Sequence, residues 1–474
     1  MAEPVISDDK QNTLFEKQSK VFPKRVWGTF RKVKWIVMLV TLSIYYLTPF
    51  IRYDRGPHAP DQAVLIDMTS SRAYFFFIEI WPQEVYYLTG LLILAAISLF
   101  LVTSLFGRIW CGYACPQTVW TDLFVWVERF VQGDRVARLK LKQAPWSLNK
   151  IAKLALTHSL WIFIGMVTGG AWVFYFNDAP TLLEQIIHFN VSIDVLGWIA
   201  ALTASTYVMA GFAREQVCKY MCPYARFQSA MFDNDSLIIG YDSGRGEKRG
   251  KYKKGSSWDD RGHCVDCTAC VQVCPVGIDI RDGLQMECIA CGLCIDACDN
   301  IMTKLELPKG LIRYDSAAGL ADSTTGEKVR LLRPRTLLYV AALAIVGALI
   351  LYGLINRSLL ELHVLHDRNP LYVQLSDGSV RNGYDIKILN KARLDKDYSV
   401  TVSGVPDAAI KVQSAGQITP DALPVFGDSI GHFRIFITGA KQDAARVPLT
   451  FELTDKDTGL TVTYKSVFAS RSND

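Results

Sequence analysis

The sequence predicts a multi-domain membrane protein with a five-helix transmembrane region, a cysteine-rich α+β insert and a C-terminal all-β sandwich. Three observations lead to this fold class. Hydrophobic residues make up 50% of the 474 positions, and five apolar runs are long enough to cross a bilayer. All 12 cysteines lie between residues 111 and 298. The tail of the chain has none and alternates polar with apolar residues, as β-strands do.

Four of the apolar runs form two predicted hairpins, and the fifth stands alone. The runs are residues 35–51, 85–106, 154–176, 191–213 and 336–356. Residues 1–34 carry eight Lys and Arg, whereas the loop 177–190 carries none. Because positively charged loops stay on the inner side of a membrane, we expect a multi-pass protein of a bacterial inner membrane with its N-terminus inside.

These features divide the chain into five predicted parts. They are a cytoplasmic basic arm (1–34), a four-helix transmembrane region (35–240), a cytoplasmic cysteine-rich domain with its linkers (241–335), a fifth transmembrane helix (336–356) and a periplasmic β domain (357–474). The β domain contains six alternating segments separated by turn residues. Their spacing and the length of the domain predict an immunoglobulin-like sandwich.

The cysteine-rich domain contains two tandem motifs. Residues 264–275 (CVDCTACVQVCP) have the spacing C-x2-C-x2-C-x3-C-P, and residues 288–298 (CIACGLCIDAC) repeat it without the proline. This spacing is typical of bacterial ferredoxins with two 4Fe–4S clusters, in which the fourth cysteine of each motif binds the other cluster. The predicted ligands of the first cluster are Cys264, Cys267, Cys270 and Cys298. Those of the second are Cys288, Cys291, Cys294 and Cys274. Two zinc sites are the alternative, which the tandem motifs disfavour.

The remaining four cysteines lie where the two hairpins end. FGRIWCGYACP (106–116) and FAREQVCKYMCP (212–223) share Phe-x-Arg followed by Cys-x-Tyr-x-Cys-Pro, which is a weak internal repeat. We expect Cys115 and Cys222 to cap helices that begin at the following prolines, where the helix dipole favours a thiolate. Such thiolates bind Cu(I), zinc or a further cluster, unless they are small buried apolar residues. The four candidates are Cys111, Cys115, Cys218 and Cys222.

Two further features concern the membrane region. Residues 116–131 place apolar residues on one helical face, which predicts an amphipathic helix either along the inner membrane surface or packed against the spans. His158 is the only histidine within a predicted span. Paired axial ligation of a haem in the membrane therefore lacks residues, and we expect His158 to be a hydrogen-bonded packing residue.

Taken together, these residues resemble the FixG/RdxA/CcoG family of cytochrome c oxidase accessory proteins, which are membrane polyferredoxins encoded with cbb3-type oxidases. The resemblance rests on the motifs at 111–116, 218–223 and 264–298, on FFFIEIWPQEVYYLTG (75–90) and RNGYDIKILNK (381–391), and on the C-terminal β domain. It implies a cupric reductase that converts Cu(II) to Cu(I) for oxidase assembly. It also implies that the four cysteines at the ends of the hairpins are its catalytic, copper-binding residues.

Two other functions stay open. One is an electron conduit within a larger redox complex, fed by a quinol or a ferredoxin; the other is a module that docks oxidase subunits. The sequence has no nucleotide- or flavin-binding fingerprint, so we expect the electron donor to be a cytoplasmic protein or a quinol. Further expected partners are a copper transporter or chaperone, cbb3-type oxidase subunits and membrane lipid, but no nucleic acid. The isolated last span leaves room for a homodimer.

Overall fold

The structure is a computed structural model that describes residues 21–252, 258, 261–321, 332–413 and 418–470. Residues 1–20 of the predicted basic arm, and most of the linker between residues 252 and 261, lie outside the described residues. The chain divides into two compact units. The first comprises residues 1–50, 64–73 and 80–347, and the second comprises 51–63, 74–79 and 348–474.

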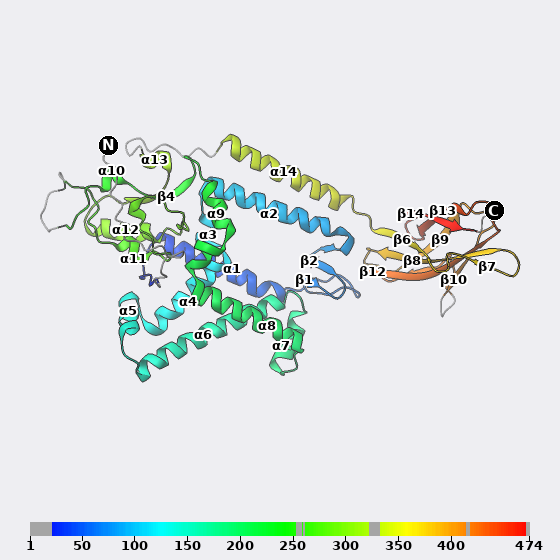
Figure 1. Ribbon diagram of the computed structural model, residues 1–474, viewed down its shortest axis with the longest axis horizontal. Helices are drawn as coiled ribbons and strands as arrows, with labels where there is room; N and C mark the ends of the chain where they lie inside the picture. Colours follow the sequence, from blue (N-terminus) through cyan, green and yellow to red (C-terminus); the bar gives the residue numbers. More distant parts are fainter. Residues whose placement is uncertain (1–20, 253–257, 259–260, 322–331, 414–417, 471–474) are drawn as a thin grey trace, which may run out of the picture. The chain divides into compact units, whose positions relative to one another are not determined.

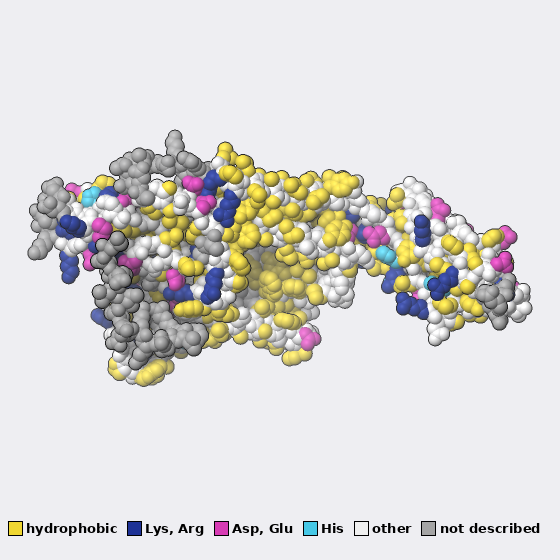
Figure 2. Space-filling model, turned by 45° about the horizontal axis from the view of Figure 1, so that its top comes forward, with side chains coloured by type: hydrophobic (Ala, Val, Ile, Leu, Met, Phe, Trp, Pro, Cys, Tyr) yellow, Lys and Arg dark blue, Asp and Glu magenta, His cyan; other side chains and the backbone are white. Residues whose placement is uncertain are grey.

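Five helices of the described chain are long and apolar enough to cross a membrane, as predicted. They are α1 (Thr29–Leu47), α2 (Val85–Phe106), α6 (Leu148–Val173), α8 (Ile193–Thr206), which continues as η3 (Tyr207–Ala213), and α14 (Pro334–Ile355). Hydrophobic side chains cover most of the helical surface seen in Figure 2, which fits contact with lipid acyl chains. Within this region His158 bonds through Nδ1 to the hydroxyl of Tyr207 at 3.0 Å, so its predicted packing role is confirmed.

The first helix begins at Thr29, before the apolar run that starts at residue 35. Its first turns carry Arg31 and Lys34, which are only 5% and 3% exposed. Nη1 of Arg31 lies 2.8 Å from Oδ2 of Asp122, and Nζ of Lys34 lies 3.9 Å from the same oxygen. Because the Asp122 carboxylate neutralises Arg31 and Lys34, both cations can be buried in a helix. The helix therefore includes residues 29–34, which the hydropathy pattern assigns to the polar N-terminal arm.

Loops between the long helices carry short elements. They are η1 (Thr48–Phe50), β1 (Val64–Asp67), β2 (Arg72–Phe75), β3 (Ile78–Ile80), η2 (Pro82–Glu84) and α7 (Ala179–Ile187). A second set lies beside the hairpin cysteines: α3 (Ile109–Tyr113), α4 (Pro116–Gln132), α5 (Arg135–Gln143), η4 (Val217–Met221) and α9 (Pro223–Ala230).

The predicted amphipathic helix is α4, and its central part packs against α6. Nε1 of Trp161 on α6 donates to the carbonyl oxygen of Phe124 at 3.2 Å, and the two rings stack with their centroids 5.2 Å apart. Phe124 is fully buried, whereas Phe130, which the sequence places on the same apolar face, is 74% exposed. The structure therefore favours packing against the spans over a helix that lies along the membrane surface.

The cysteine-rich domain is α+β and lies in the first unit, at the end of the helices where α3 and α9 are found (Figure 1). Its elements are β4 (Leu237–Tyr241), α10 (Ser243–Gly246), α11 (Ala269–Val273), η5 (Ile280–Asp282), α12 (Leu293–Lys304), β5 (Ile312–Ser316) and α13 (Ala317–Ala321). Strands β4 and β5 pair antiparallel, with Leu237 opposite Ser316 and Tyr241 opposite Ile312. Helices α11 and α12 each begin within one cysteine motif, so the repeated sequence folds into a repeated structure.

The C-terminal domain is an all-β sandwich, as predicted. One sheet has the order β10-β12-β8-β6, with β7 also paired to β8, and the other has the order β11-β9-β13-β14. The strands are β6 (Leu360–His366), β7 (Val373–Gln374), β8 (Val380–Asn390), β9 (Lys396–Ser403), β10 (Ala409–Gln413), β11 (Leu423–Val425), β12 (Ser429–Gly439), β13 (Arg446–Asp455) and β14 (Thr461–Ala469). Alternate residues such as Tyr384, Ile386 and Ile388 are fully buried in one core, which no cysteine pair has to staple.

Candidate functional site

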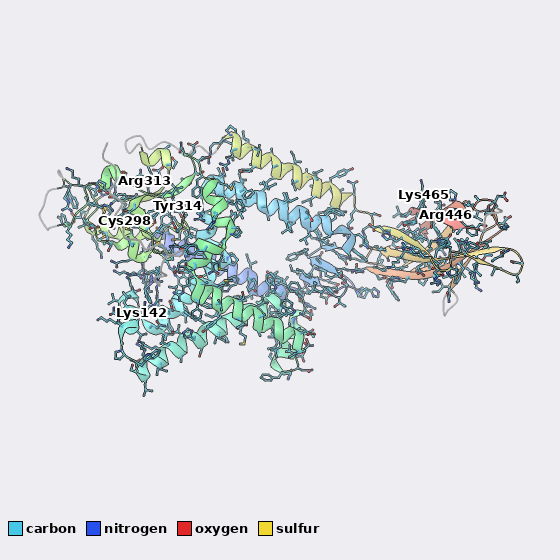
Figure 3. All side chains as sticks on the ribbon, in the orientation of Figure 1. Lys142, Cys298, Arg313, Tyr314, Arg446 and Lys465 are labelled. Atoms are coloured by element: carbon cyan, nitrogen blue, oxygen red, sulfur yellow. The ribbon has the colours of Figure 1, made fainter. Side chains whose placement is uncertain are left out.

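The first predicted cluster quartet lines one cavity. Cys264, Cys267, Cys270 and Cys298 all border a cavity of about 20 Å³. Cys298 comes from α12 (Figure 3), whereas Cys270 lies in α11 and the other two lie in the loop before it. The structure thus brings the last cysteine of the second motif to the triplet of the first.

The second quartet is gathered in the same crossed fashion. Cys291, Cys288 and Cys274 are the strongest electrostatic neighbours of the partly buried Cys294, followed by Cys270 of the first quartet. Backbone N–H groups of residues 276–278 donate to the sulfur of Cys274, and burial raises the pKa of the Cys288 thiol to about 12. Amide groups aimed at sulfur stabilise thiolate ligands and tune the potentials of iron–sulfur centres.

The chemistry of the two quartets fits a pair of 4Fe–4S clusters, which would supply single-electron transfer when bound. In the described part of the chain, no three His, Cys, Asp or Glu side chains are arranged to hold a single metal ion. This finding applies to zinc and to iron–sulfur ligation alike, so the tandem motifs carry the choice of clusters.

Arg281 is the cation beside the first quartet. It borders the same cavity as the four cysteines. Its Nη2 lies 2.6 Å from Oδ2 of Asp279, and its Nη1 lies 2.5 Å from Oδ1 of Asp266. Hydrogen bonding to these two carboxylates raises the pKa of Arg281, so the guanidinium keeps its charge next to the sulfurs.

Replacing Arg281 by glutamine is expected to lower the reduction potential at the first quartet by on the order of 50 mV. Loss of the positive charge leaves two carboxylates near the site, and both disfavour an added electron. An EPR-monitored redox titration of the full chain measures this shift. Arg313→Gln is the matched control, because Arg313 pairs with Asp242 and Asp315 elsewhere in the domain. Equal potentials in wild type and Arg281→Gln would contradict the assignment.

The four hairpin cysteines occupy equivalent places in the two halves of the repeat. Cys111 lies in α3 and Cys218 lies in η4. Cys115 is the N-cap of α4, and Cys222 is the N-cap of α9, with a proline at the first helical position in each case. The predicted capping positions are thus confirmed.

The four thiols lie close enough to influence one another. Cys115, Cys218 and Cys222 are all electrostatic neighbours of Cys111, and Cys115 and Cys222 are neighbours of Cys218. Burial raises the pKa of the Cys111 thiol to about 12 and that of the Cys218 thiol to about 11. Binding of a metal at these thiols is therefore expected to release protons. As in the two quartets, no three of the four hairpin cysteines, all of which the structure describes, are arranged to hold a single metal ion.

Two buried arginines, one from each Phe-x-Arg segment, join the halves. Arg108 reaches α9, where its Nε donates to Oε1 of Gln228 at 3.3 Å and its Nη2 donates to the carbonyl oxygen of Ala225. Arg214 reaches α4, where its Nη2 lies 2.6 Å from Oε1 of Glu128. Each half thus supplies the cation that fixes the helix after the Cys-Pro pair of the other half. This exchange brings the four cysteines together.

Helix α3 also lies directly on the loop between two ligands of the second quartet. A Cβ atom on Gly112 would lie 2.7 Å from the carbonyl oxygen of Ile289 and 2.8 Å from that of Ala290, so only glycine permits this approach. The hydroxyl of Tyr113 donates to the carbonyl oxygen of Cys291 at 3.1 Å. The hairpin cysteines and the cluster domain therefore share one interface within the first unit.

A chain of hydrogen bonds crosses that interface. Nη1 of Arg108 donates to the carbonyl oxygen of Cys288 at 3.2 Å. The same guanidinium and the thiol of Cys111 both donate to Oε1 of Gln228, the thiol at 3.0 Å. Cys288 of the second quartet is thus connected to Cys111 through two side chains.

Sequence reasoning missed Arg108, Gly112 and Gln228 as site residues. The repeat contained a signal for the first, because Phe-x-Arg precedes the cysteines in both halves. The signal for Gly112 is its position directly after Cys111, because a glycine beside a candidate ligand indicates that another backbone approaches closely there. No local pattern distinguishes Gln228, whose partners lie 117 residues or more away.

Comparison with known proteins agrees with these motifs and domains. Residues 213–317 match a family described as a 4Fe-4S dicluster domain, and residues 88–133 match one described as a 4Fe-4S binding domain. Residues 350–471 match the IG-like fold at the C-terminus of FixG, a putative oxidoreductase in that description.

Two curated relatives match nearly the whole chain. The chain is 50% identical to nitrogen fixation protein FixG of Rhizobium meliloti, covering 96% of this chain and 93% of that one. It is 46% identical to protein RdxB of Cereibacter sphaeroides, over 98% and 99% of the two chains. A crystal structure of a FixG-related protein from Vibrio parahaemolyticus covers 24% of this chain and 98% of its own, with 22% identity and a TM-score of 0.21. The chain belongs to the FixG/RdxA family and is an iron–sulfur electron-transfer protein.

Proposed function

We propose that the protein reduces Cu(II) to Cu(I) at Cys111, Cys115, Cys218 and Cys222, and that the Cu(I) serves the assembly of cbb3-type cytochrome c oxidase. The observation that carries this proposal is the hydrogen-bonded connection from Cys288 through Arg108 and Gln228 to Cys111. It gives an electron in the cluster domain a short route to the hairpin thiols. Copper is the substrate, and the clusters are the resident cofactors.

The chemistry of the site suits this step. Reduction of Cu(II) takes one electron, which matches the single-electron capacity of an iron–sulfur centre. Thiol sulfur prefers Cu(I) to Cu(II), so four converging cysteines favour the reduced product.

The proposal includes a location and partners. The N-terminus and the cluster domain lie in the cytoplasm of a bacterium, the helices span the inner membrane, and the C-terminal sandwich lies in the periplasm. A copper transporter or chaperone exchanges copper with the hairpin cysteines. The sandwich docks cbb3-type oxidase subunits, and a second copy of the chain packs against the last span.

Replacing both Cys115 and Cys222 by serine is expected to abolish copper reduction. The loss should exceed the roughly 10–100-fold that removal of an outer-sphere partner costs, because two direct ligands disappear. The measurement is the oxidation of the dithionite-reduced protein by Cu(II), followed by cluster absorbance. Iron content should stay at the wild-type level, since neither cysteine belongs to a cluster quartet.

Tyr220→Phe is the matched control, because Tyr220 lies between Cys218 and Cys222 with its side chain 51% exposed. It should reduce copper like the wild type. Copper reduction that survives in the double serine variant would remove the hairpin cysteines as the site. Loss of iron in that variant would instead assign these cysteines to a further cluster.

A further inference from the structure

An apolar cavity of about 440 Å³ lies between α1 and α2 at the end nearest the cluster domain. Its walls include Val33 and Val37 of α1, Val102 and Phe106 of α2, and Trp110 of α3. The volume falls within the range of small-molecule sites, about 300–1,000 Å³. None of the described side chains that line it is charged.

One wall of the cavity consists of two tyrosines that touch the second quartet. The hydroxyl of Tyr113 donates to the carbonyl oxygen of Cys291 at 3.1 Å. The hydroxyl of Tyr314, which Figure 3 places in the cluster domain, donates to the carbonyl oxygen of Ala290. Ala290 lies between Cys288 and Cys291 in the sequence. Only the side chains of Tyr113 and Tyr314 therefore separate a molecule in the cavity from the loop that carries these two predicted cluster ligands.

The lining decides which class of molecule fits. The valines and Phe106 belong to helices that are long and apolar enough to cross a membrane, so the ligand reaches the cavity from the lipid phase. A nucleotide is excluded, because its phosphates need cations or free backbone N–H groups. An acyl chain makes no use of a position beside the ligand loop of a redox centre. A redox-active, ring-shaped apolar molecule fits both the apolar wall and this position.

We propose that this cavity is a quinol-oxidation site and that a membrane quinol supplies the electrons of the protein. The proposal names the electron donor of the copper reduction proposed above and rests on that function for the fate of the electrons. Both tyrosine hydroxyls donate to carbonyl oxygens of the loop 288–291, so the aromatic rings, and not the hydroxyls, form the cavity wall. A quinol ring that packs against these rings lies beside the loop that carries Cys288 and Cys291.

The reaction balances with the cofactors that the family supplies. Oxidation of one quinol to the quinone breaks two O–H bonds, passes two protons to water and releases two electrons. Two 4Fe–4S clusters held by the two cysteine quartets would take one electron each. Such a pair would match a two-electron donor to the one-electron reduction of copper.

The test uses the full-length protein in detergent with both clusters loaded, and decylubiquinone as the probe. Val102→Trp fills the cavity from α2, and Val37→Trp fills it from α1. We expect each variant to weaken equilibrium binding of decylubiquinone at least tenfold and to slow anaerobic reduction of the clusters by decylubiquinol. Leu91→Trp is the matched control, because Leu91 is exposed on the same helix about 16 Å from Val102. It should behave like the wild type.

Two results would overturn the site: unchanged decylubiquinone binding in both filled variants, or wild-type clusters that stay oxidised in excess decylubiquinol. Copper reduction is tested separately with dithionite as the donor. In that assay the wild type and Leu91→Trp should reduce Cu(II) at the same rate. Failure of the wild type in that assay would contradict the proposed copper reduction. It would not contradict the quinol site, which the decylubiquinone-binding measurement tests independently.

Discussion

Replacing Gly112 by alanine is expected to slow the passage of electrons from the reduced protein to Cu(II) by about 10- to 100-fold. The added Cβ would lie 2.7 and 2.8 Å from two carbonyl oxygens of the loop 288–291, which is closer than any stable contact of this kind. The helix that carries Cys111 must therefore move away from the second quartet. A misplacement of about 1 Å between reacting groups costs up to roughly a hundredfold in rate.

Stopped-flow mixing of dithionite-reduced protein with Cu(II), monitored by cluster absorbance, measures this rate. Gly170→Ala in α6 is the matched control, because no atom lies within 4 Å of its added Cβ. Iron content should be equal in both variants, since Gly112 is not a ligand. A wild-type rate in Gly112→Ala would show that electrons do not cross at α3.

Replacing Glu128 by glutamine is expected to destabilise the membrane region by about 3–5 kcal/mol. Glu128 is 1% exposed and pairs with two arginines, Arg138 and Arg214, which are almost equally buried. Removal of the carboxylate charge leaves two guanidinium groups in a low-dielectric environment without a counter-charge.

Denaturant or thermal unfolding of the detergent-solubilised protein, followed by circular dichroism, measures this loss. Glu184→Gln on α7 is the control, because Glu184 is exposed and its replacement should change stability by less than about 0.5 kcal/mol. Equal unfolding midpoints for Glu128→Gln and wild type would show that the buried arginines are neutralised by other groups.

The parts of the fold that local sequence determines were predictable. Continuous apolar runs identified the spans, and Pro116 and Pro223 marked the helices that Cys115 and Cys222 cap. The ferredoxin spacing predicted the crossing of Cys298 to the first motif, and the structure places it there. The spans and the capped helices have causes within a few residues of the signal, whereas the crossing of Cys298 was predictable because the spacing of the two motifs is itself characteristic.

The parts that depend on distant partners were not predictable. The start of α1 required knowledge that Asp122 meets Arg31 and Lys34. The strands β10 and β11 span five and three residues, and such short segments carry too little alternation to be recognised. Gln228 acquires its role only when α9 lies against α3, and a single sequence contains no signal of that contact.

The exchanged arginines also impose an order on biogenesis. Arg108 emerges from the ribosome before its acceptors Ala225 and Gln228, which follow 117 and 120 residues later. Burial of the Arg108 guanidinium without these acceptors costs several kcal/mol of desolvation free energy. The first hairpin therefore cannot reach its final packing until the second hairpin has been synthesised. The four hairpin cysteines therefore come together only after both halves of the repeat have been synthesised.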